Sequence, residues 1–152
     1  MYFINKLKEY GNKRIRLFVD MDGVIADYDV GVARDYDKKR PLYSNIEKLE
    51  EISKLDNIEI YILSITRETV GRDEKHEWLD KYVPFVKREN RIIISREENN
   101  YTASKILKNK YIKRLKRDDS LIILIDDDPQ ILRKVMDNNK DVILFKDTVL
   151  VD

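Results

Sequence analysis

Five short apolar runs, separated by stretches with helical periodicity, set the strongest limit on how this chain can fold. The runs are rich in Ile, Val and Leu, and most of them show no polar alternation. That pattern is typical of parallel strands that are buried on both faces of a sheet. The five runs are RIRLFVD (14–20), IEIYILS (58–64), RIIIS (91–95), SLIILID (120–126) and DVILF (141–145).

The stretches between these runs carry apolar residues three or four positions apart, as one-sided helices do. The first of them begins with a capping pair, Ser44 and Glu47, and the last opens with Pro129, which suits a first helical turn. Helices are therefore predicted at 44–55, 72–82, 102–116 and 129–139. Alternating strands and helices indicate an α/β fold with a doubly wound, mainly parallel five-stranded sheet. We expect a single domain over residues 1–152.

Composition excludes several kinds of site. The chain has no cysteine, which rules out disulfides, zinc–thiolate centres and cysteine nucleophiles, and its one histidine, His76, cannot make a multi-histidine metal site. Thirty basic residues nearly balance 29 acidic ones. The basic run at 108–117 is interpreted as a solvated helix face. No stretch is long enough to span a membrane, and the N-terminus lacks the apolar core of a signal peptide, so we expect a soluble cytoplasmic protein.

Polar residues gather where the predicted strands end. Asp20 and Asp22 follow the first strand, Ser64 ends the second, and three aspartates at 126–128 end the fourth. A helix that begins near residue 102 carries Lys105 in its first turn. Parallel strands place their carboxyl ends at one edge of the sheet, where ligands bind. These groups should therefore converge on one crevice.

An all-oxygen set of ligands favours a hard cation. Asp20, Asp126 and a backbone carbonyl would suit Mg²⁺, which keeps several of its waters and most often serves a phosphate. Ser64, the neighbouring backbone N–H groups and Lys105 are the candidates for binding the phosphate oxygens. The sequence thus predicts a magnesium and phosphate site.

These residues resemble the four motifs of the haloacid dehalogenase-like (HAD) phosphohydrolases, over roughly residues 14–145. The motifs are DMDGV (20–24), the serine after the second strand, a helical lysine, and IDDD (125–128). DMDGVIADY (20–28) and EKHEWLDKYVPF (74–85) are also similar to the 5′(3′)-deoxyribonucleotidase branch. That branch has a larger helical cap, for which this chain has only a short flap at about residues 23–43.

The resemblance implies a role for each motif residue. Asp20 would be the nucleophile that forms an aspartyl-phosphate. Asp22 would be the general acid and base, with a pKa raised by the neighbouring carboxylate, and its backbone carbonyl would bind the metal. Asp126 would complete the metal ligands, Asp127 would act through a water, and Asp128 would cap the next helix.

The phosphoryl group would be bound by Ser64, by the N–H group of Ile65 and by Lys105, with Lys108 and Lys110 as alternatives for the lysine. Tyr28, Tyr36 and Tyr43 fall in or beside the flap, where one of them could stack on a substrate ring. Trp78 is interpreted as a core residue.

The leading hypothesis is a Mg²⁺-dependent phosphomonoesterase. Its substrate would be a small phosphorylated molecule, a nucleoside monophosphate. One alternative is a phosphatase of polynucleotide ends, in which the open crevice and the 108–117 run hold a nucleic-acid strand. Another is a non-catalytic protein that keeps the fold to bind phosphate or protein. Retention of both Asp20 and Asp22 argues against that last reading.

Overall fold

A parallel sheet of five strands, in the order β3-β2-β1-β4-β5, forms the middle layer of the protein. The computed structural model describes residues 2–28 and 36–151. All four pairs of neighbouring strands are parallel, which confirms the predicted doubly wound α/β fold. The strands are β1 (Ile15–Val19), β2 (Ile58–Thr66), β3 (Arg91–Ser95), β4 (Leu121–Asp126) and β5 (Val142–Lys146).

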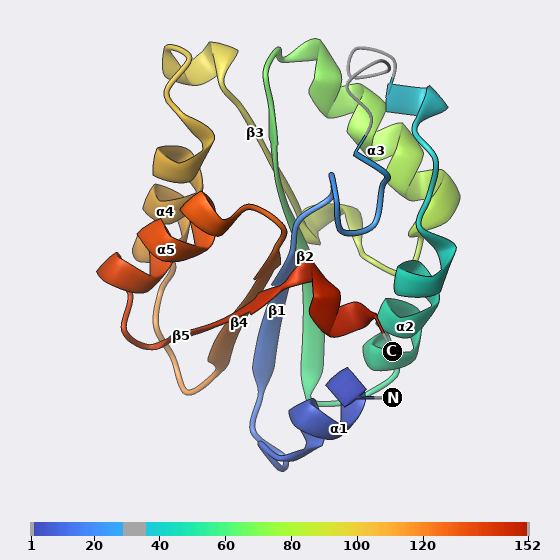
Figure 1. Cartoon of the computed structure of the whole chain (residues 1–152), viewed down its shortest axis with the longest axis vertical. Coiled ribbons are helices and arrows are strands. Elements are labelled where there is room, and N and C mark those ends of the chain that lie inside the picture. Colours follow the sequence, from blue (N-terminus) through green and yellow to red (C-terminus); the bar gives the residue numbers. More distant parts are fainter. Residues whose placement is uncertain (1, 29–35, 152) are drawn as a thin grey trace.

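Helices cover both faces of the sheet, so the apolar side chains on each face are removed from water (Figure 1). On one face, α4 and α5 pack over Phe18, Leu63 and Leu124. On the other face, α1, α2 and α3 pack over a larger core that includes Leu17 and Ile62. The helices are α1 (Tyr2–Lys8), α2 (Tyr43–Ser53), α3 (Val70–Tyr82), α4 (Ser104–Arg114) and α5 (Pro129–Asn138).

Several predicted boundaries differ from the structure. Helix α1 was not predicted, since its seven residues are too short to show a clear period. The predicted cap Ser44 lies inside α2, which starts after Leu42 without a side-chain cap. Strand β2 continues two residues past Ser64 to Thr66 because these residues pair with β3. The predicted cap at Asp128 is confirmed, since its side chain accepts a hydrogen bond of 2.8 Å from the N–H group of Gln130.

The strand order places a switch point beside β1. From β1 the chain moves outward through β2 and β3, then returns to add β4 and β5 on the other side. Adjacent carboxyl ends at such a point leave a crevice for a ligand. Asp20 directly follows β1 and Asp126 is the last residue of β4, so the fold brings both carboxylates to this crevice.

The two ends of the flap are joined by backbone hydrogen bonds. Backbone hydrogen bonds join Asp27 to Arg40 and Leu42 to Ile25, so the two ends of the flap lie side by side. Part of the flap, at 29–35, lies outside the described residues. Within the described ranges, none of the helices has the length and apolar character needed to cross a membrane.

Candidate active site

Three carboxylates meet at the carboxyl ends of β1 and β4. Asp20, Asp126 and Asp127 each offer an oxygen, and these oxygens lie within 4.8 Å of one another. Asp126 is fully buried and Asp20 nearly so. Burial and the nearby Asp20 raise the pKa of Asp127 to about 7, and the same two causes raise the pKa of Asp126. So much negative charge in a buried place favours a cation.

A buried lysine already supplies part of that positive charge. Lys108 Nζ donates to Asp20 Oδ1 at 2.8 Å and to Asp126 Oδ2 at 2.6 Å. Burial by itself would lower the pKa of Lys108, but the two carboxylates outweigh burial and raise its pKa above the ordinary value. Lys108 therefore stays charged and joins α4 to the ends of β1 and β4.

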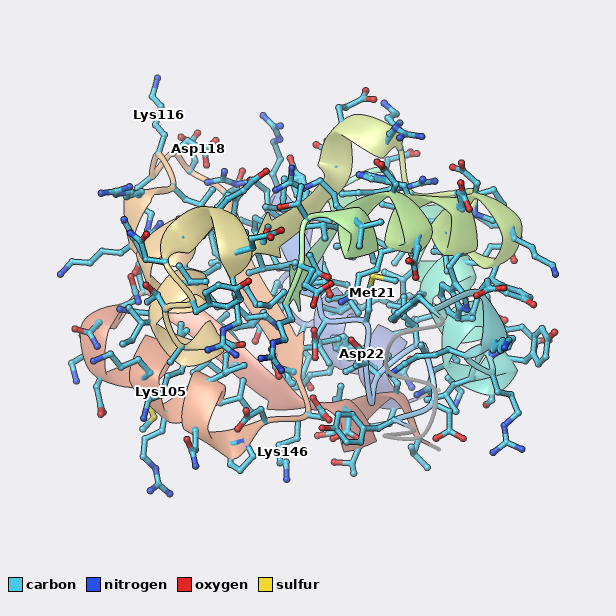
Figure 2. The ribbon with its side chains drawn as sticks, turned by 90° about the horizontal axis from the view of Figure 1, so that it is seen from above. Met21, Asp22, Lys105, Lys116, Asp118 and Lys146 are labelled. Carbon is cyan, nitrogen blue, oxygen red and sulfur yellow. The ribbon has the colours of Figure 1, made fainter. Side chains whose placement is uncertain are left out.

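Lys105, the lysine expected at the phosphate, lies elsewhere. Its side chain is exposed and lines a separate hollow between α4 and α5. Figure 2, seen from above the view of Figure 1, shows Lys105 well apart from Asp22. Side chains on a helix lean toward its N-terminus, so a lysine one turn inside the helix reaches the sheet edge while one in the first turn overshoots it. Lys108, which was an alternative, occupies the position that was expected of Lys105.

The carboxylate of Asp22 points into a different set of partners. It accepts hydrogen bonds from Lys39 Nζ at 2.8 Å, Lys75 Nζ at 3.2 Å and the Tyr36 hydroxyl at 3.0 Å. Burial would raise the pKa of Asp22, but Lys75 and Lys39 outweigh it and the pKa lies below its ordinary value. We expected the neighbouring carboxylate to raise this pKa. That expectation is wrong because the ammonium groups of Lys39 and Lys75 contact the carboxylate of Asp22.

Lys75 is a site residue that the sequence analysis missed. Its ammonium group donates to Asp22, to Ser64 Oγ at 2.7 Å and to the carbonyl oxygen of Ile65 at 2.7 Å. Burial lowers the pKa of Lys75, and the aspartates only partly oppose this. A signal was present in the sequence, since Lys75 stands three and four residues before the buried Trp78 and Leu79. A lysine on an apolar helix stripe is costly to bury without a purpose.

Ser64 and Ile65 take up positions that differ from a simple strand end. Ser64 is fully buried inside β2 and its hydroxyl contacts Lys75. Ile65 pairs with Ile94 of β3. It also lines the hollow beside Asp22 and Lys75, which is the main hollow of the site. Thr66, the last residue of β2, also lines that hollow, and its hydroxyl donates to the carbonyl oxygen of Glu68 at 3.1 Å. It is a further candidate phosphate ligand that the sequence analysis did not single out.

The main hollow has a volume of about 480 Å³, which falls in the range of small-molecule sites. Aromatic rings and charges of both signs line it. The exposed Tyr28 and the buried Tyr36 contribute the rings, whereas Tyr43 packs edge-on against Tyr82 instead. The charged lining residues are Asp22, Lys39, Arg67, Glu68, Glu74 and Lys75. Of the five aspartates in the DMDGV and IDDD motifs, only Asp22 lines this hollow.

Contacts with α3 position the described part of the flap. The indole N–H group of Trp78 donates to the carbonyl oxygen of Lys39 at 3.0 Å. The ring of Tyr36 packs edge-on against that of Trp78, with 5.9 Å between their centres. The N–H group of Tyr36 donates to Glu74. Trp78 is buried, as expected for a core residue, and it also anchors the segment that carries Lys39.

Gly23 lets the chain turn between the two motif aspartates and the flap. It adopts a positive φ of 84°, which favours glycine. A Cβ atom at this position would collide with the carboxylate of Asp127. The glycine of the DMDGV motif is thus required by both backbone conformation and space.

The residues present fit a divalent metal. Asp20, Asp126 and Asp127 provide only oxygen donors, and one lysine cannot neutralise three carboxylates. Hard cations such as Mg²⁺ prefer such ligands. The predicted metal residues Asp20 and Asp126 lie together, and Asp127 joins them. The side chain of Asp22 faces its lysines instead, so any ligand from Asp22 would be its backbone carbonyl.

Comparison with known proteins supports the fold. No protein-family model and no curated protein matches this sequence. A chain in the structure of the Pnkp1/Rnl/Hen1 complex is similar to it, with a TM-score of 0.68 and 18% identity over 90% of this chain. This protein spans under half of that chain, 46% of its length. The HAD domain of the effector protein Lem4 from Legionella pneumophila is also similar, with a TM-score of 0.52 and 16% identity. It is matched over 89% of this chain and 87% of its own. The chain therefore has a HAD-like fold.

Proposed function

We propose that this protein is a Mg²⁺-dependent phosphomonoesterase that uses Asp20 as its nucleophile and takes a nucleotide as substrate. The observation that carries the proposal is the buried group of Asp20, Asp126 and Lys108 beside a lysine-lined hollow. A HAD-like fold supports it, because the motif residues occupy the ends of neighbouring strands.

In the first half of the reaction, a carboxylate oxygen of Asp20 bonds to phosphorus while the bond from phosphorus to the substrate oxygen breaks. A proton from Asp22 goes to the departing oxygen, so an alcohol leaves and an aspartyl-phosphate remains. In the second half, water attacks phosphorus, Asp22 takes a proton from that water, and Asp20 is released with inorganic phosphate. Lys108 holds Asp20 in place throughout.

The metal would be held by Asp20, Asp126 and the backbone carbonyl of Asp22, with Asp127 nearby. When bound, Mg²⁺ supplies positive charge that offsets the repulsion between an anionic nucleophile and an anionic phosphate. The side chains of Lys75 and Lys39 would add to that charge from the hollow.

Asp22 must gain a proton to act as an acid, yet its lysine partners lower its pKa. A phosphate in the hollow would compete with Asp22 for the hydrogen bonds of Lys75 and Lys39. Losing these donors would leave the partial burial of Asp22 unopposed, and burial raises the pKa of a carboxyl group. Substrate binding therefore prepares Asp22 for proton transfer.

The hollow supports a nucleoside as the leaving group. Tyr28 is exposed at its rim, where a base could stack on the ring, and the volume suits a group of this size. One of the similar solved structures is an RNA repair complex. The end of a polynucleotide is therefore the second class of substrate to test.

The test is phosphate release from nucleoside monophosphates, sugar phosphates and oligonucleotides phosphorylated at either end, with Mg²⁺ or with EDTA. We expect release from nucleotide substrates with Mg²⁺ alone, and none above background from Asp20→Asn. The matched control is Asp56→Asn, an exposed aspartate in the turn before β2, which should keep full activity. Equal activity in Asp20→Asn and the parent protein would contradict the proposal, as would silence across the whole panel.

A further inference from the structure

The face formed by α4 and α5 carries an excess of positive charge. The two helices pack side by side (Figure 1), joined by a buried hydrogen bond of 2.9 Å from Asn139 Nδ2 to Asn109 Oδ1. Six exposed basic residues lie on them against one acidic residue, Asp137. The six are Lys105, Lys110, Lys113, Arg114, Arg133 and Lys134.

These six side chains form no ion pair within the described part of the chain. Basic residues elsewhere do pair, as Arg72 does with Glu98, Arg91 with Asp80, and Arg117 with Asp141. Lys105 even stands in the first turn of α4, where the helix dipole disfavours a cation. Unpaired positive charges kept together in this way repel one another unless an anion lies between them.

Part of this charge lines the hollow between α4 and α5. The hollow has a volume of about 460 Å³ and is lined by Lys105, Arg133 and Lys134, with Asp137 as the acidic residue. Ser104, the residue before Lys105, lines the main hollow. The first turn of α4 therefore contributes residues to both hollows.

The length of the basic face indicates a polyanion. Lys105 and Lys113 are about 80° apart around the axis of α4, and the helix rises by about 12 Å between them, a length over which a nucleic-acid strand presents several phosphates. Lys110 and Arg114 line a separate hollow with Ile94 of β3. Each helix exposes one apolar side chain, Ile106 and Met136, but neither carries the Trp or Phe that anchors a helix in a membrane surface.

We propose that the α4–α5 face binds the sugar–phosphate backbone of a single nucleic-acid strand whose phosphorylated end occupies the main hollow. The inference rests on the proposed function only for the fate of that end, since the face would bind the strand without any turnover. If the proposed reaction holds, this face adds affinity for a polynucleotide end that a free nucleoside monophosphate does not gain.

The experiment measures the affinity of a fluorescent single-stranded oligonucleotide by anisotropy, in EDTA, at several salt concentrations. The test variant is Arg133→Glu/Lys134→Glu. We expect its affinity to fall by at least about tenfold at low salt, and the slope of log affinity against log salt to fall by roughly 1.4, or about 0.7 for each lost phosphate contact. The neutral variant Arg133→Gln/Lys134→Gln should fall between this variant and the parent, and circular dichroism checks that all variants fold.

The matched control is Lys54→Glu/Lys87→Glu, which makes the same charge change at exposed lysines away from α4 and α5. It should stay within a factor of about two of the parent, since net charge alone has a small effect. Equal weakening in both double variants would overturn the proposal, and so would binding of anionic vesicles without binding of oligonucleotide. Nucleoside monophosphate turnover should be unchanged in Arg133→Glu/Lys134→Glu. If no substrate is turned over but the oligonucleotide result holds, the proposed reaction fails while the binding face stands.

Discussion

Lys108 shows how one residue can be both a structural and a chemical requirement. Its side chain is 2% exposed and bridges two carboxylates from different strands. Removing one member of a buried ion pair leaves the other charge without compensation, and this typically costs about 3–5 kcal/mol. An exposed lysine without a partner contributes far less.

We therefore expect Lys108→Met to lower the free energy of unfolding by about 3 kcal/mol or more in EDTA, and to abolish phosphate release. Lys105→Met should change the unfolding free energy by less than about 0.5 kcal/mol and keep turnover of small substrates. Urea unfolding and phosphate-release assays on the same preparations measure both effects. If the two variants behave alike, Lys108 does not have the place in the site that its contacts indicate.

Lys75 and Ser64 illustrate a second lesson at the level of single residues. Ser64 was predicted to bind phosphate because it lies near a strand end. Its hydroxyl contacts Lys75, and Lys75 rather than Ser64 lines the main hollow. The lysine was overlooked because it stands in a highly charged helix. Both Lys75 and Lys108 lie three or four residues before a buried apolar residue, and that spacing separates them from solvated lysines such as Lys105.

Helix α3 contacts the site, the flap and the sheet. Its buried face carries Lys75 to the site and Trp78 to the flap, and its other end is held to β3. There Arg91, with a side chain only 4% exposed, donates to Asp80 Oδ1 at 2.6 Å. This pair, together with the hydrogen bond from Arg72 Nε to the carbonyl oxygen of Ile93, helps to hold α3 over the sheet and thus to position Lys75.

The pair between Asp80 and Arg91 predicts a pH dependence. The hydrogen bond from Arg91 lowers the pKa of Asp80 below its ordinary value of 3.8. Its stabilising effect is therefore present above that pH and is lost as the pH falls through the lower, folded-state pKa. Asp80→Asn should be less stable than the parent protein at neutral pH, and the difference should shrink in strong acid.

Urea unfolding of both proteins at neutral and acidic pH makes the comparison. The matched control is Asp56→Asn, which removes an exposed carboxylate outside this contact. If the difference in unfolding free energy between Asp80→Asn and the parent stays constant with pH, the charge of Asp80 does not contribute to its contact with Arg91.

At the scale of the whole molecule, the fold concentrates charge from segments that are distant in the sequence. Asp20 and Asp126 are separated by more than one hundred residues, yet both accept hydrogen bonds from the same lysine. The carboxylates in such a site repel one another, so a bound cation stabilises the folded chain.

Mg²⁺ should accordingly raise the melting temperature of the protein. At about one hundred times its dissociation constant, a ligand that binds only the folded state adds about 2.7 kcal/mol. Thermal unfolding with Mg²⁺ and with EDTA measures the shift. Asp126→Asn should lose most of it, whereas Asp56→Asn should keep it. A shift of the same size in Asp126→Asn would move the metal away from the carboxylate cluster.

The sequence by itself determined the fold class and the edge of the sheet at which the motif residues meet. Buried parallel strands need continuous apolar runs, and parallel topology leaves only one edge for their carboxyl ends. The placement of Asp20, Asp126 and the cap at Asp128 follows from local patterns of that kind. The tertiary structure alone decided which lysine reaches the aspartates, that β2 runs on to Thr66, and that Asp22 faces Lys39 and Lys75. These features depend on the position of each helix along the sheet and on the direction of each side chain. Packing between elements that are distant in the sequence sets both, so local sequence patterns do not reveal them.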